Sequence, residues 1–113
     1  MTWQDLLDEA RKGLNDPSKV TWPDADLLTR VISTRRELFG LHPEAFCVSA
    51  VVTALPTDPS ETSLTSSIDF DTSWVASVIH HIQWQCFMED SDERQNIQQA
   101  QRHYDAWEKR VGV

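Results

Sequence analysis

The sequence has little glycine, little cysteine and no long apolar run, and each shortage argues against a class of protein. With three glycines in 113 residues, the chain has no glycine-rich loop of the kind that cradles phosphates. Its two cysteines, Cys47 and Cys86, lack CxxC spacing, which argues against a zinc site or a disulfide framework and favours free thiols. No apolar stretch is long enough to span a bilayer, and the start is not typical of a secretory signal. We therefore expect a soluble intracellular protein with no membrane contact and no cofactor.

Basic residues are also scarce. Ten Lys and Arg stand against eighteen Asp and Glu, which gives a formal net charge of -8. Such a chain is poorly suited to gripping nucleic acid, because that binding depends on neutralising phosphates. An acidic surface could still let DNA pass without holding it. The few basic residues near Arg11 and Arg35 have acids beside them and predict ion pairs rather than a DNA-reading helix.

Apolar residues recur at spacings of three and four over most of the chain and predict about four helices. Thr2 and Asp5 can cap the first helix reciprocally, and Pro17 stops it. The second helix is expected to start at Thr21 to Pro23 and to end at Gly40 to Pro43. The third is expected to start at Asp71 to Ser73 and to end near Met88. The fourth is expected to start at Ser91 or Asp92 and to end at Gly112. The short joint between the last two predicts an antiparallel pair.

The middle of the chain has a different pattern. Residues 46–55 alternate, with Phe46, Val48, Ala50 and Val52 on one side, and residues 64–70 alternate again after the Pro56–Glu61 turn. This pattern predicts a β-hairpin or a long extended loop. The fold class is therefore mainly α, with residues 1–113 forming one small bundle of about four helices and a hairpin or extended loop inserted at about 46–70.

The stretch from Trp74 to Met88 is apolar on two sides when residues are placed about 100° apart. One side carries Trp74, Val75, Val78, Ile79, Ile82 and Cys86, and the other carries Ala76, His80, Trp84, Phe87 and Met88. One face can serve the core, and a helix that is apolar nearly all round is normally buried all round. The second face therefore needs another helix or another chain to cover it, and we expect Trp84, Phe87 and Met88 to contact neighbouring subunits.

The order of these features resembles a known family. The first helix ends in Leu14-Asn15-Asp16-Pro17, the second opens with Trp22-Pro23-Asp24-Ala25-Asp26-Leu27-Leu28, and the end carries Asp90, Asn96, Ala100, His103, Tyr104, Trp107 and Gly112. With an extended excursion before the final helical pair, this arrangement is similar to the small head-to-tail adaptor, or head-completion, proteins of tailed bacteriophages. The likeness is clearest over residues 2–45 and 71–112 and least clear over 46–70.

The resemblance implies a structural virion protein of the head-tail neck that is not an enzyme. It implies a ring of about twelve copies, closed by heterologous contacts, that docks on the portal protein and meets the next connector or tail protein. DNA would pass through the lumen without specific binding. Trp22 and the segment Pro56 to Glu61, with Pro56, Asp58 and Pro59, are the secondary candidates for subunit or portal contacts. In related adaptors, extended segments and terminal arms commonly provide docking.

Two other functions stay open. One is a cytosolic helical regulator that forms a small oligomer and binds a partner protein. The other is a metal-dependent enzyme at His80 and His81. Neighbours on a helix point about 100° apart, and the residues four further on, Trp84 and Gln85, are not usual zinc ligands. The sequence therefore argues against a shared metal at the two histidines.

Overall fold

The computed structural model describes residues 1–14, 22–48, 50–89 and 94–112. Its helices are α1 (Trp3–Leu14), α2 (Asp24–Leu41), α3 (Val75–Glu89) and α4 (Arg94–Val111), with short 3-10 turns η1 (Pro43–Phe46), η2 (Glu61–Ser63) and η3 (Thr72–Trp74). The predicted small bundle of about four helices is confirmed. No strand occurs within the described ranges, where the only β-type pairing is one isolated antiparallel bridge between Thr2 and Ser67.

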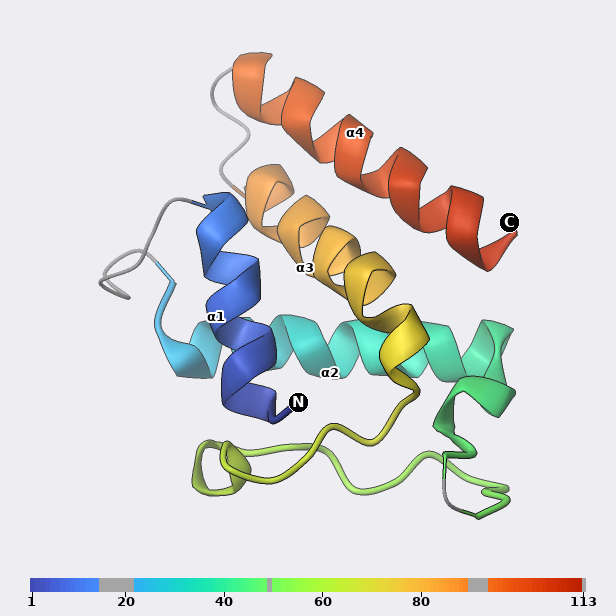
Figure 1. Ribbon diagram of the computed structural model, residues 1–113. Helices are drawn as coiled ribbons and strands as arrows, with labels where there is room; N and C mark the ends of the chain where they lie inside the picture. Colours follow the sequence, from blue (N-terminus) through green and yellow to red (C-terminus); the bar gives the residue numbers. More distant parts are fainter. Residues whose placement is uncertain (15–21, 49, 90–93, 113) are drawn as a thin grey trace.

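Helix α3 is the centre of the bundle and contacts each of the other three helices. In Figure 1, α1 and α3 lie side by side across α2, and α4 runs antiparallel to α3 on the side away from α1. The molecule is flat, with extents of 43 × 33 × 18 Å. The predicted antiparallel arrangement of the last two helices is therefore what the structure has.

Local capping chemistry sets several helix ends. The Thr2 amide donates to Asp5 Oδ2 at 3.0 Å and the Asp5 amide donates to Thr2 Oγ1 at 3.2 Å, so the predicted reciprocal cap is confirmed. Asp71 accepts from the Ser73 amide at 2.8 Å and opens η3. Gly112 follows α4 with a φ of 74°, a conformation that glycine adopts without strain. The predicted caps at Ser91 or Asp92, and the signals at residues 15–17 and at Thr21, lie outside the described residues.

The core is built from one face of each helix. The first expected face of α3 is buried at Val78, Ile82 and Cys86, which pack with the buried stripes of α1 and α2. The α1 stripe consists of Trp3, Leu6, Leu7 and Ala10, and the α2 stripe of Leu27, Leu28, Val31 and Leu38. Each fully buried Leu or Ile stabilises the fold by roughly 1.5–3 kcal/mol before entropy is counted. The helical periodicity of the sequence therefore identifies this core.

The hairpin alternative for residues 46–70 is wrong, and the extended-loop alternative holds. The segment runs across the molecule between η1 and η3, and η2 is the only turn of helix among its described residues, 50–70 (Figure 1). Its alternating residues form main-chain hydrogen bonds with the start of α1 instead of with a partner strand. The Leu64 carbonyl accepts from the Gln4 amide at 2.9 Å, and the Ser66 carbonyl accepts from the Trp3 amide at 3.0 Å. The first amides of a helix have no partner within it, so this segment completes the start of α1.

Candidate interaction surface

The second apolar side of α3 faces α4. The Trp84 ring lies 4.7 Å from the Tyr104 ring, and the Phe87 ring stacks on His103 at 5.6 Å and 8°. Trp84 and Phe87 are half-buried, whereas Met88 is 46% exposed. Helix α4 of the same chain is the other helix that covers this face. Its part in subunit contact stays a prediction, with Met88 the most accessible of the three.

The secondary candidates in the extended segment surround a buried arginine. Arg35 on α2 is fully buried and donates from Nη1 to Asp58 Oδ1 at 2.7 Å and from Nη2 to the Pro56 carbonyl at 3.2 Å. It also forms a two-point contact with Asp69, through Nε to Oδ1 at 3.2 Å and through Nη2 to Oδ2. Charge-assisted contacts of this forked geometry are among the strongest hydrogen bonds in proteins. Pro56 and Asp58 therefore anchor the segment to α2.

Two further features complete this anchor. Pro59 is buried, and the Arg35 guanidinium lies 5.6 Å from the Trp3 ring centroid and 5.8 Å from that of Phe46. These rings shield the cation from water, which strengthens its interaction with the carboxylates. Residues from both ends of the 46–70 segment thus meet at one side chain of α2.

Trp22 lies at the start of α2 beside two other buried arginines. Its carbonyl accepts from Arg11 Nε at 3.1 Å and Nη2 at 3.0 Å, and the Arg30 guanidinium lies 4.7 Å from its ring centroid. The Trp22 side chain is half-buried. This predicted contact residue therefore fixes the approach to α2 against α1, while part of its ring remains open to solvent.

A buried polar cluster lies between α2 and α3. His81 is 1% exposed, with Nε2 at 2.7 Å from Glu37 Oε2 and Nδ1 at 2.7 Å from Thr34 Oγ1. Burial lowers the pKa of His81, so the neutral ring donates from Nε2 to Glu37 and accepts at Nδ1. A carboxylate, an imidazole and a hydroxyl in this order resemble a hydrolytic triad. Thr34 is fully buried, however, and no substrate can reach its hydroxyl.

His80 and His81, the two histidines weighed as a metal site, point to different neighbours. His81 lies in the polar cluster, and His80 Nδ1 is 2.8 Å from His103 Nδ1 on α4. Among the residues that the structure describes, no three His, Cys, Asp or Glu side chains are grouped so that they could hold a metal ion. The geometry accordingly gives no support to a metal shared by His80 and His81.

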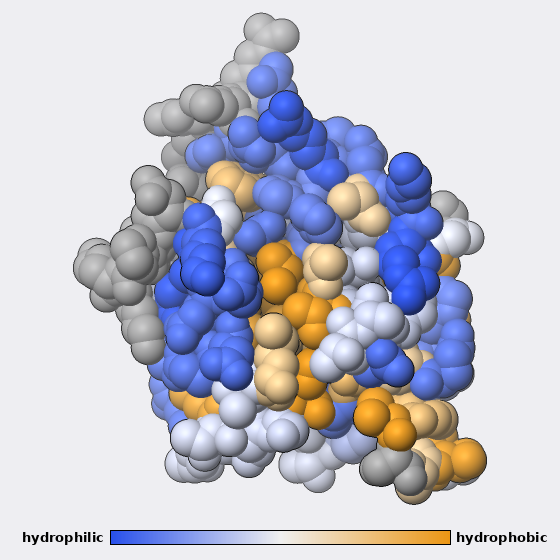
Figure 2. All heavy atoms as spheres, viewed as in Figure 1, coloured by the Kyte–Doolittle hydropathy of each residue, from blue (hydrophilic) through white to orange (hydrophobic). Residues whose placement is uncertain are grey.

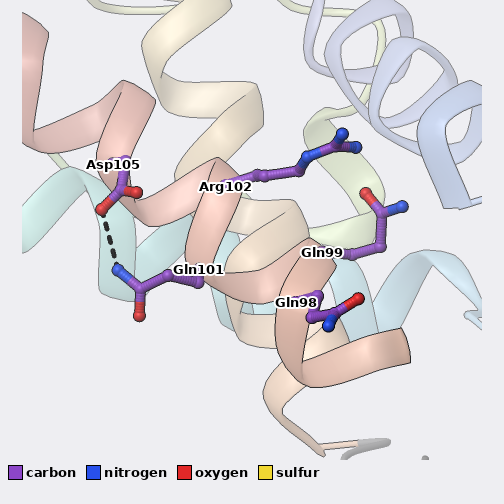
Figure 3. A pocket seen from close by; sticks show the side chains of 5 residues that line it. All are labelled: Gln98, Gln99, Gln101, Arg102 and Asp105. Atoms are coloured by element: carbon purple, nitrogen blue, oxygen red, sulfur yellow. Dashed lines mark hydrogen bonds between the residues drawn. The ribbon is translucent and has the colours of Figure 1, made fainter. Parts of the chain in front are cut away.

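The outer surface of α4 has a shallow polar hollow. Figure 3 shows its lining side chains, Gln98, Gln99, Gln101, Arg102 and Asp105, which all come from this one helix. Gln101 Nε2 donates to Asp105 Oδ1 at 2.8 Å. Arg102 and Gln98 extend in different directions and do not converge on a common point (Figure 3). The hollow is therefore ordinary helix surface rather than a site for a small ligand.

Exposed apolar side chains gather at two ends of the molecule. The turn end consists of Met88 near the end of α3 and Ile97 near the start of α4, 46% and 50% exposed. The corner end consists of Leu41, Val48 and Val51, and Val51 is 86% exposed. Figure 2 shows apolar atoms at the lower right, where the chain follows α2, and others over α3 in the middle of the view. The alternation of residues 46–55 predicted a hairpin strand or an extended loop around Val48 and gave no sign of the corner end.

The turn end and the corner end lie far apart. In Figure 1, the last turn of α3 and the first turn of α4 are at the upper left, and the chain that leaves α2 is at the lower right. In the described part of the chain, no helix is both long and apolar enough to cross a membrane. Comparisons with protein-family models, with curated proteins and with solved structures give no match for this chain.

Proposed function

We propose that this chain is a structural subunit that joins copies of itself head to tail into a ring, and that the ring is an adaptor of a phage head-to-tail connector. In this proposal the ring docks on the portal protein, extends the DNA channel towards the next connector or tail protein, and resides in the neck of the virion. The family assignment rests on the sequence resemblance at residues 2–45 and 71–112.

The observation that carries the assembly step is the separation of the turn end from the corner end. A ring with heterologous contacts needs two different patches on each subunit, placed so that one copy's first patch meets the next copy's second. Met88 and Ile97 on one side, and Val48 and Val51 on the other, meet this requirement with exposed apolar side chains. Neither group is used in the core of the chain.

The charge of the chain supports the conduit. Each copy carries a formal charge of -8, so a ring of many copies is strongly acidic. Like charge repels the phosphates of DNA and keeps the duplex from adhering to the wall. Specific DNA binding has no place in this function.

The experiment measures the mass of the chain in solution, alone and with purified portal rings. We expect a monomer alone and about twelve chains bound per portal when both are present. A stable dimer without portal affinity would favour the alternative, a helical regulator that binds another partner. A chain that stays monomeric with portal present would refute the adaptor proposal.

Two surface variants test the contacts themselves. Met88→Glu and Val51→Glu should each prevent ring closure, because each places a charge at one of the two ends without touching the core. With portal rings present, an equimolar mixture of the two variants keeps one intact junction and should form pairs that cannot extend. Gln101→Glu on the outer surface of α4 is the control and should assemble like the parent chain. If both single variants form complete rings, the two ends are not the subunit contacts.

A further inference from the structure

His42 lies where two helices end. Its amide donates to the Leu38 carbonyl at 2.7 Å and closes α2, and its Nε2 is 2.7 Å from the Val111 carbonyl in the last turn of α4. On the other side of the ring, Nδ1 is 2.8 Å from Glu44 Oε1. The ring lies 4.9 Å from the Trp74 ring of η3. One side chain thus links the ends of α2 and α4.

Both polar partners of the His42 ring can only accept hydrogen bonds. A backbone carbonyl and a carboxylate have no proton to give, and a neutral imidazole has a single N–H. The two contacts can therefore exist together only when the ring is a doubly protonated imidazolium. A cation is also favoured at a helix C-terminus by the partial negative charge of the last carbonyls, and two such ends meet here.

The neighbouring charges agree with this protonation state. The Val111 carbonyl, followed by Glu44, raises the pKa of His42 above its ordinary value of 6.5, while burial and Arg110 oppose the rise. Arg110 on α4 also interacts with the carboxylate of Asp71, which precedes η3. The imidazolium is thus held between one carboxylate and one carbonyl, with a single arginine acting against it.

A second histidine contact on α4 has the opposite requirement. His80 Nδ1 and His103 Nδ1 are 2.8 Å apart, so one nitrogen donates and the other accepts, and at least one of the two rings must be neutral. Burial lowers the pKa of His103, and the charges of His80 and Arg102 lower it further. Phe87 stacks on His103 and supplies no charge. Protonation of both rings would break this contact.

We propose that α4 is attached through two histidine contacts of opposite proton requirement, a protonated latch at His42 and a neutral contact at His80 and His103, so that raising the pH releases its C-terminal end and lowering the pH loosens its middle. The His42 latch stabilises the fold fully below the unfolded-state pKa of about 6.5. That contribution is lost as the pH rises through the higher folded-state pKa. The His103 contact weakens as the pH falls below about 6.5, because the folded state binds that proton less readily.

The direct test is a titration of the full chain by nuclear magnetic resonance, with nitrogen signals of the imidazole rings and amide signals of Val111 and Gly112. We expect His42 to titrate above 6.5, with both ring nitrogens protonated below its midpoint. The two amides should shift and lose protection from hydrogen exchange with the same midpoint. A neutral His42 ring below pH 6.5, or amides that do not follow its titration, would overturn the latch.

Two variants separate the two contacts. His42→Gln cannot titrate and should abolish the alkaline loss of thermal stability while keeping the acid loss. His103→Gln, the matched control on α4, should keep the alkaline loss and reduce the acid loss, of which the buried His81 retains its own share. An alkaline loss of the same size and midpoint in His42→Gln would overturn the proposal. If His42→Gln does not fold, the titration of the parent chain decides the question alone.

Discussion

Replacing Arg35 with alanine should release the extended segment from α2 and lower the free energy of unfolding by about 3 kcal/mol. Removing one member of a buried ion pair costs about 3–5 kcal/mol, because the partner charge is left uncompensated. Arg35 is fully buried, but its partners Asp58 and Asp69 are 35% and 22% exposed and can be partly rehydrated. The lower end of the range therefore applies.

The size of this loss makes it easy to measure. A chain of 113 residues is stable by about 6–17 kcal/mol, so Arg35→Ala should remain folded at 25 °C. At about 4 °C per kcal/mol, the melting temperature should fall by roughly 12 °C. Urea unfolding gives the free energy, and limited proteolysis reports whether cleavage within residues 47–70 becomes faster than cleavage elsewhere.

The adjacent arginine is a matched control. Arg36 also contacts Asp58, at 3.3 Å, but its side chain is 67% exposed, and such pairs contribute about 0–1 kcal/mol. Arg36→Ala should therefore change little. The triple change Arg35→Met, Asp58→Asn and Asp69→Asn should recover part of the loss, because no buried charge is left unpaired. If Arg35→Ala costs no more than Arg36→Ala, Arg35 does not anchor the segment.

The structure also makes predictions about two glycines and two thiols. Alanine usually stabilises a helix interior by about 1 kcal/mol over glycine, and Gly40→Ala should do so because a Cβ there meets nothing within 4 Å. Gly13→Ala should instead lower the free energy of unfolding, measured in urea, by about 1 kcal/mol. The new Cβ would come 2.0 Å from Nε2 of Gln83. Gln83 would have to move, and its buried hydrogen bond to the main chain would be lost. A gain at Gly13 equal to that at Gly40 would contradict the packing of Gln83. One thiol per folded chain should react with an aromatic disulfide reagent at pH 8, because Cys47 is exposed while burial raises the pKa of Cys86 to about 12; two reactive thiols in the folded chain would contradict the burial of Cys86.

Local features of the sequence were sufficient to locate the helices. The reciprocal cap of Thr2 and Asp5, the Asp71 cap and the final glycine each act within a few residues. They can therefore be recognised in the sequence without knowledge of tertiary contacts. The apolar spacing of α1, α2 and α3 likewise identified the faces that are buried. Ile97 is the exception, because it fits the spacing of α4 and yet lies exposed near the helix start.

Contacts between distant residues could not be predicted. Arg35 meets carboxylates 23 and 34 residues away, and no local pattern pairs them. The alternation of residues 64–70 is a genuine pattern, but it serves the free amides of α1 rather than a neighbouring strand. The double face of α3 was recognised correctly, whereas periodicity alone could not say whether α4 or another subunit covers Trp84.

The completion of α1 by the carbonyls of Leu64 and Ser66 has a consequence for synthesis on the ribosome. Helix α1 cannot gain its last main-chain partners until about fifty more residues have followed it, and its apolar stripe is covered by α3 only later still. Arg35 likewise waits for 23 more residues to gain Asp58 and for 34 to gain Asp69. Such long-range dependence slows folding because loops must close before contacts form, so the nascent chain should stay protease-sensitive until α3 has left the exit tunnel.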